Sequence, residues 1–134
     1  MTSDMQDRLI DKIKLENGLT LELRDRSRRV AGDRWVVSFV ARIDVEVRPE
    51  YFEDPDSEHL SFDAIRKAVG DKVTYRYEKT RNFIKETEKD EVLRGLKDRF
   101  MSATIGYLSS PDFALKLILK KYQDAKGRIQ WGGQ

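Results

Sequence analysis

The chain contains no cysteine and a single histidine, His59, among its 134 residues. The absence of cysteine excludes disulfides, thiolate metal sites and thiol nucleophiles. No stretch approaches the roughly 18 to 20 consecutive apolar residues that a membrane helix needs. The start, Met1 to Arg8, is polar and lacks the apolar segment of a secretory signal. We therefore expect a cytoplasmic protein without a membrane segment.

The chain also lacks a strong excess of charge of either sign. Charged residues make up 37% of it, but the net charge is only +2, which indicates a solvated mixed surface rather than a dedicated polyanion binder. The length is typical of one domain that buries a core without disulfides or metals. We expect a single domain over residues 1–126. Residues 127–134, rich in glycine, are predicted to form a flexible C-terminal tail.

The strongest pattern that is present is an alternation of apolar residues from Trp35 to Val47, which is typical of a β-strand with one buried face. The same period of two recurs over residues 19–23 and 73–77. Its phase predicts one shared apolar face for the three segments. The aromatic residues on that face are therefore expected in the core and not in a ligand site: Trp35, Phe39, Tyr75 and Tyr77.

The Asn17-Gly18 pair predicts a hairpin between the first two strands. A two-residue loop would place Leu15 opposite Thr20, whereas a three-residue loop places Leu15 opposite Leu19. Directly opposed side chains share a face, so the three-residue loop keeps the apolar set together. It also predicts the left-handed conformation of a G1 bulge for Gly18.

The connection into the long strand raises a problem of parity. If Gly32-Asp33 is a tight turn, Val30 pairs with Trp35, and Leu23 no longer matches the apolar phase of the long strand. A bulge within residues 24–30 would restore the match. A wider loop would do the same, and the sequence leaves both alternatives open.

Three helices are predicted in the second half of the chain. Ser61 is a suitable N-cap and Gly70 a suitable stop for the first, and Thr87 is expected to cap the second. Ser110-Pro111-Asp112 predicts the start of the third. The order is β-β-β-α-β-α-α. The fold class is α+β, with a curled antiparallel sheet of about four long strands and helices packed on its apolar face.

The length of the long strand favours a partner. A strand of about 14 residues spans roughly 46 Å at ~3.3 Å per residue. A compact domain of this size has a radius of gyration of only about 14 Å. The strand must therefore curl, break at a bulge, or project. A projecting apolar face needs a partner, and a second copy of the chain, giving a homodimer, is the simplest one.

Arginines are concentrated in the segment that leads into the long strand. Guanidinium groups bind phosphates well, so a hairpin carrying them suits an anion or a nucleic acid. The alternative is a hydrated hairpin end whose charges discourage edge-to-edge aggregation. The candidate anion-binding residues are Arg24, Arg26, Arg28, Arg29 and Arg34.

A second candidate site surrounds the single histidine. Carboxylates beside an imidazole can hold a divalent cation or act as an acid–base pair, although acidic residues in a polar loop are usually only solvated. The spacing does not fit an EF-hand, whose glycine position is taken by His59. The candidate metal ligands are Asp54, Asp56, Glu58 and His59.

No motif for nucleophilic catalysis accompanies these residues. The chain has neither a Gly-x-Ser-x-Gly elbow nor a glycine-rich phosphate loop. We therefore expect no enzymatic activity and no cofactor. The sequence favours a non-catalytic binding or assembly module that acts through protein–protein contacts with an unidentified partner. The alternative is anion or nucleic-acid binding through the arginine-rich hairpin of residues 24–34.

Overall fold

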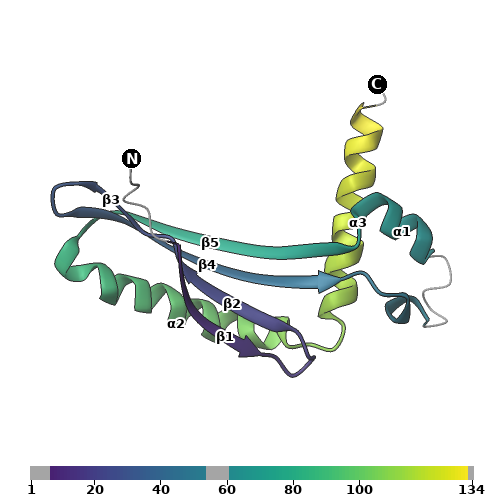
Figure 1. Cartoon of the computed structure of the whole chain (residues 1–134), viewed down its shortest axis with the longest axis horizontal. Helices are drawn as coiled ribbons and strands as arrows, with labels where there is room; N and C mark the ends of the chain where they lie inside the picture. Colours follow the sequence, from purple (N-terminus) through teal and green to yellow (C-terminus); the bar gives the residue numbers. More distant parts are fainter. Residues whose placement is uncertain (1–6, 54–60, 133–134) are drawn as a thin grey trace. The chain divides into compact units, whose positions relative to one another are not determined.

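A computed structural model describes residues 7–53 and 61–132 of the chain. Within these residues it has a curled antiparallel sheet and three α-helices, so the predicted α+β class is confirmed (Figure 1). The strands are β1 (Arg8–Lys14), β2 (Thr20–Asp25), β3 (Arg28–Ala31), β4 (Arg34–Glu46) and β5 (Lys72–Lys85). The helices are α1 (Phe62–Val69), α2 (Lys89–Leu108) and α3 (Phe113–Gly132). No helix in this part of the chain is both long and apolar enough to cross a membrane.

The long strand β4 is the centre of the sheet. It pairs with β2, β3 and β5, while β1 pairs with β2. The predicted apolar alternation is confirmed, since every second residue from Trp35 to Val47 is buried. Both Leu21 and Leu23 of β2 are also fully buried. The shared apolar face inferred from the sequence is therefore the core side of the sheet.

The first hairpin has the predicted three-residue loop. The Leu15 N–H donates to the Leu19 carbonyl at 2.8 Å, and the Gly18 N–H donates to the Leu15 carbonyl at 2.9 Å. Gly18 has φ +89°, the left-handed conformation expected of a G1 bulge. The register argument from side-chain parity is thus confirmed.

The second hairpin resolves the choice that the sequence left open. Arg29 lies opposite Trp35 and Ala31 lies opposite Arg34, so Val30 is an extra residue in a bulge. The turn itself is tight, with Gly32 at φ +53°. Leu23 consequently lies opposite Ala41, and both are buried. The bulge, not a wider loop, restores the parity.

The strand predicted from residue 19 onward is divided into β2 and β3. At the break, a side-chain hydroxyl takes the place of a backbone carbonyl in the hydrogen-bond ladder. The Arg26 N–H donates to the Ser38 carbonyl at 2.9 Å, which continues the β2–β4 register. The Ser38 N–H then donates to the Ser27 hydroxyl at 3.1 Å instead of to a backbone carbonyl. Asp25 supports this arrangement, because its carboxylate accepts the Ser27 N–H at 2.9 Å. The side chains of Asp25, Ser27 and Ser38, which are the buried polar residues at the break, therefore all have hydrogen-bond partners.

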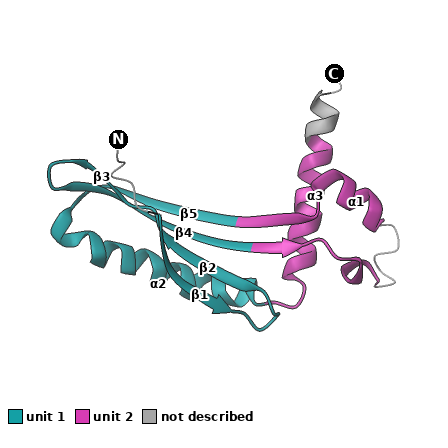
Figure 2. Ribbon diagram, in the orientation of Figure 1, with its two compact units in different colours: residues 1–43, 76–109 teal, residues 44–75, 110–134 magenta. Residues whose placement is uncertain are grey.

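The chain divides into two compact units that share β4 and β5 (Figure 2). Unit 1 comprises residues 1–43 and 76–109, and its core contains a cluster of three rings. Phe100 of α2 lies 5.5 Å from Phe39 and 4.7 Å from Tyr77, measured between ring centroids. Helix α2 therefore covers the apolar face of this part of the sheet, as expected.

Unit 2 comprises residues 44–75 and 110–134. Its helices α1 and α3 pack against each other, and Ile65 and Ile118 are buried there. Phe113 of α3 contacts Tyr75 of β5, with ring centroids 5.8 Å apart. Since both long strands run through the two units, the single domain over residues 1–126 stays a prediction.

The helix ends agree with the sequence in two of three cases. The Ser61 hydroxyl accepts the Ala64 N–H, and Gly70 ends α1 at φ +90°. Ser110 precedes α3 and its carbonyl accepts the Phe113 N–H at 3.2 Å. The expected Thr87 cap of α2 is wrong, because Thr87 lies inside a 3-10 turn (Glu86–Glu88) and Glu88 occupies the N-cap position.

Helix α3 continues to Gly132. The segment from residue 127 that was expected to be a tail therefore has a helical backbone as far as the structure describes it. Its predicted flexibility stays a prediction.

Gly18 in the turn and Gly106 in α2 provide a matched pair of positions for testing the conformation of the first hairpin. A Cβ atom would meet no other atom at either position, so only backbone conformation differs. Gly18→Ala is expected to lower the free energy of unfolding by about 1 kcal/mol, because φ +89° disfavours a side chain. Gly106→Ala, within α2, is expected to raise it by about 0.5–1 kcal/mol. Urea denaturation measures both, and a change of equal sign would contradict the proposed turn.

Candidate anion-binding site

The polar face of the sheet in unit 1 carries an open pocket lined by four arginines. Arg24 lies on β2, Arg26 directly after it, Arg42 on β4 and Arg76 on β5. Asp7 and Val40 complete the lining, and the pocket encloses about 220 Å³. The alternation of β2 and β4 places these side chains opposite the core. Three neighbouring segments of the sheet thus bring guanidinium groups to one place.

Arg24 is held in this pocket by two carboxylates. Its Nε donates to Glu22 Oε1 at 2.7 Å, and its Nη1 donates to Asp7 Oδ1 at 3.0 Å. The hydrogen bond to Glu22, followed by that to Asp7, raises the pKa of Arg24. The Arg24 guanidinium is therefore charged and oriented before any ligand binds.

Among the described residues that line the pocket, Asp7 is the only acidic one. Its second carboxylate oxygen lies 3.9 Å from Arg26 Nε, which is too long for a hydrogen bond. More than half of the Asp7 side chain is exposed to solvent. The Asp7 carboxylate therefore lies where an anionic ligand between Arg24 and Arg26 would lie. Its side chain is exposed, and Asp7 is the first residue that the structure describes.

On the opposite side of the pocket Arg76 is oriented by Glu78. The Arg76 Nη1 donates to Glu78 Oε1 at 3.0 Å, and the Ser38 hydroxyl donates to Glu78 Oε2 at 2.5 Å. The Ser38 hydrogen bond lowers the pKa of Glu78, with further contributions from Arg76 and from the charge of Arg26. Glu78 is thus an anion at neutral pH that positions Arg76 from the flank.

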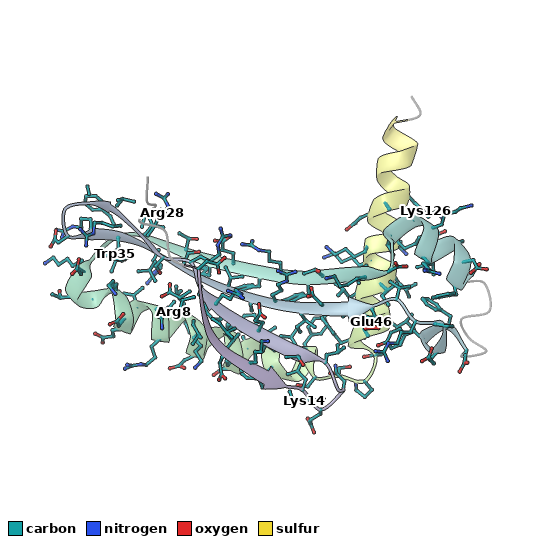
Figure 3. All side chains as sticks on the ribbon, viewed as in Figure 1. Arg8, Lys14, Arg28, Trp35, Glu46 and Lys126 are labelled. Atoms are coloured by element: carbon teal, nitrogen blue, oxygen red, sulfur yellow. The ribbon has the colours of Figure 1, made fainter. Side chains whose placement is uncertain are left out.

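The structure separates the five arginines that the sequence grouped together. Arg24 and Arg26 reach the pocket, whereas the other three belong to the β3–β4 hairpin, where Figure 3 shows Arg28 and Trp35. There Arg29 Nη2 lies 3.7 Å from Glu86 Oε1, and Arg34 Nη1 donates to Asp33 at 2.9 Å. The break at Ser27 divides the run between these two places.

Arg42 and Arg76 were missing from the predicted site. Arg42 and Arg76 each lie between apolar residues in the alternating pattern of their strands, so the sequence already indicated that they are on the polar face of the sheet. What the sequence lacked was the pairing of both β2 and β5 with β4, which brings distant arginines together. Long-range pairing of this kind is not encoded in local patterns.

The predicted metal ligands Asp54, Asp56, Glu58 and His59 lie outside the described residues. Over residues 7–53 and 61–132, no group of three or more histidine, aspartate or glutamate side chains could hold a metal ion. The prediction for the His59 loop therefore stays a prediction. Comparison with protein-family models, with curated proteins and with solved structures found no match.

Ser38 provides a test of the charge arrangement around Glu78. Ser38→Ala removes the largest cause of the low pKa, so the Glu78 carboxyl is expected to titrate at higher pH, closer to the ordinary value of 4.5. Carbon-detected NMR titration of the Glu78 carboxyl measures the change. Asp112, whose pKa is lowered by Ser110 in unit 2, should titrate as before and serves as the control.

The same substitution has a consequence for stability. A glutamate with a lowered folded-state pKa stabilises the fold above its unfolded pKa, and this contribution is lost as pH falls through the folded-state pKa. The loss of stability on acidification should therefore be smaller in Ser38→Ala than in the unmodified protein. An unchanged Glu78 titration would contradict the assigned hydrogen bond.

Proposed function

We propose that the protein is a non-catalytic binding module that holds a phosphate group of a ligand in the pocket lined by Arg24, Arg26, Arg42 and Arg76. The observation that carries this proposal is the convergence of four guanidinium groups from separate sheet segments on one pocket. Guanidinium forks match the oxygens of a phosphate in charge and in geometry. A sheet positions such groups more firmly than a loop does.

The size of the pocket limits what it can enclose. At about 220 Å³ it is smaller than the roughly 300–1,000 Å³ of pockets that hold a whole drug-sized molecule. A phosphate group would fill it, and the rest of a larger ligand would lie outside. The pocket therefore supports recognition of an anionic group without selecting the remainder of the ligand.

Asp7 supports the proposal because it shows where an anion is stabilised. Its carboxylate accepts a hydrogen bond from Arg24 and lies near Arg26, so an incoming phosphate would compete with it. Exposed ion pairs of this kind contribute only about 0–1 kcal/mol. Displacement of Asp7 by a ligand with more acceptor oxygens is therefore energetically accessible.

Removing the Asp7 charge and removing a pocket arginine should change the affinity for phosphate in opposite directions. Asp7→Asn is expected to strengthen the binding of inorganic phosphate. Arg42→Ala and Arg76→Ala are each expected to weaken it about tenfold to a hundredfold, since a hydrogen bond to a charged group contributes about 1.5–3 kcal/mol. NMR titration with phosphate at low ionic strength measures the affinities. Weaker binding by Asp7→Asn would contradict the proposal.

Arg48→Ala is the matched control for these variants. Arg48 is an exposed arginine of unit 2 that pairs with Glu46 at 3.3 Å, outside the pocket. Its removal lowers the net charge by the same amount as the pocket substitutions. Equal losses of affinity in Arg48→Ala and Arg42→Ala would show that phosphate responds to net charge and not to a site.

A second proposal is assembly through protein–protein contacts, with a second copy of the chain as the simplest partner. The observation that favours it is the length of β5, whose 14 residues pair with β4 along one edge of the described sheet. The opposite edge of a long strand offers backbone groups to another chain. Light scattering after size-exclusion chromatography at micromolar concentration tests it, and a monomeric mass would rule out the homodimer.

A further inference from the structure

Phe83 of β5 combines two unusual properties. It is the one non-glycine residue in the described part of the chain with a positive φ, at 62°. Its side chain is 68% exposed, more than that of the other exposed large hydrophobic residues. A bulky residue seldom adopts the left-handed conformation, and an exposed ring contributes little to the core.

The backbone conformation follows from the pairing of β5 with β4. At one end of the two strands the Val47 N–H donates to the Asp71 carbonyl, and at the other the Glu86 N–H donates to the Asp33 carbonyl. Between these bonds β4 has 13 residues and β5 has 14. One residue of β5 is therefore in excess, and the left-handed conformation assigns the bulge to Phe83.

The bulge alone does not explain why a phenylalanine occupies this position. A bulge interrupts the edge of a strand locally, but any residue that tolerates the left-handed conformation would serve for that. Asn82, directly before Phe83, adopts that conformation more readily. Unfavourable backbone conformations tend to persist where they serve a function. The exposed ring is thus the feature that needs a reason.

A cation lies against this ring. The Arg34 guanidinium carbon lies 5.5 Å from the centre of the Phe83 ring. Two more cations lie against Trp35 of the hairpin: Arg29 at 5.8 Å and Lys89, the first residue of α2, at 4.8 Å from the ring centre. Residues 28–34 and 79–89 together hold seven lysines and arginines against three carboxylates. Since the whole chain has a net charge of only +2, its positive charge is concentrated in these two segments.

We infer that Phe83 is a stacking platform for a base of single-stranded nucleic acid, with Arg28, Arg29 and Arg34 facing the phosphates. This inference goes beyond the proposed function, because these residues do not line the arginine pocket. Exposed aromatic rings beside cations are how proteins bind single strands, the ring taking a base and the cations the backbone. A duplex keeps its bases stacked on one another, so a free base face is offered by a single strand.

Fluorescence anisotropy with a labelled oligo-dT of about 10 nucleotides tests the inference at low ionic strength. Phe83→Ala is expected to weaken binding about tenfold, as the loss of one stacked base does, whereas Phe83→Trp should retain it. Tyr107→Ala is the matched control, because Tyr107 is another exposed aromatic residue of unit 1, on α2. Equal affinities of Phe83→Ala and the unmodified protein would overturn the inference, as would a lack of oligo-dT binding.

Phe83→Gly separates binding from stability. Glycine adopts the left-handed conformation without strain, so this variant is expected to unfold at higher urea concentration while losing about tenfold in affinity for oligo-dT. Loss of both stability and affinity would reduce Phe83 to a structural role. The bulge would then be the whole explanation of its conformation.

The phosphate and oligo-dT assays test the arginine pocket and the Phe83 platform independently of each other. Arg42→Ala should reduce the binding of inorganic phosphate and leave oligo-dT binding within about twofold. Arg42 contributes a single charge and lies eight residues further along β4 than Arg34, roughly 26 Å at ~3.3 Å per residue. Arg34→Ala should do the reverse and should also reduce the salt dependence of oligo-dT binding. Equal binding of oligo-dT and of heparin, each insensitive to Phe83→Ala, would reduce the hairpin to an unselective cationic surface.

Discussion

The described sheet depends on the pairing of β4 with three other strands. Because β2, β3 and β5 all bond to β4, the register of each is set by one common strand. A slip of a single residue would turn the apolar side chains of that strand to the polar face. The register shifts at Val30 in β3 and between Leu9 and Asp11 in β1, and we assign the extra residue of β5 to Phe83; these shifts accommodate strands of unequal length.

The same constraint produces the arginine pocket. Once the apolar residues of β2 and β4 face α2, their intervening residues must face away from it. Arg24 and Arg42 reach the polar face for this reason, and the pairing of β5 with β4 adds Arg76. Glu22 and Asp7 hold Arg24 in place, and Glu78 orients Arg76. A single strand register thus places the core residues on one face of the sheet and the candidate site on the other.

The hairpin between β3 and β4 has a different character. Its residues are largely exposed, so packing does not select them, and its sequence is free to carry charge. Arg34 lies against Phe83 and Arg29 against Trp35, which joins the cations of the hairpin to aromatic faces. The pocket offers a confined place for one anionic group, whereas the hairpin offers an open surface. The two proposed modes of anion recognition therefore rest on one sheet in unit 1.

Much of the fold could be predicted because its signals are local. The three-residue loop at Gly18 followed from comparing which side chains share a face, and the Ser61 and Gly70 ends of α1 followed from capping chemistry. Thr87 misled because a 3-10 turn precedes α2, and the hydrogen bond that ties this turn to Asp33 joins residues far apart in the chain. The left-handed Phe83 was missed because a bulge interrupts the period of two on which the strand prediction relied.

The sequence by itself determined the class of the fold, the buried face of β4 and the polar character of the opposite face, since alternation and capping act between near neighbours. Only the tertiary structure decided which polar side chains meet. It brought Arg42 and Arg76 to Arg24 and Arg26, and left Arg28, Arg29 and Arg34 on the hairpin. The physical reason is that strand pairing joins residues distant in sequence through backbone hydrogen bonds, which every residue type except proline can make in the same way.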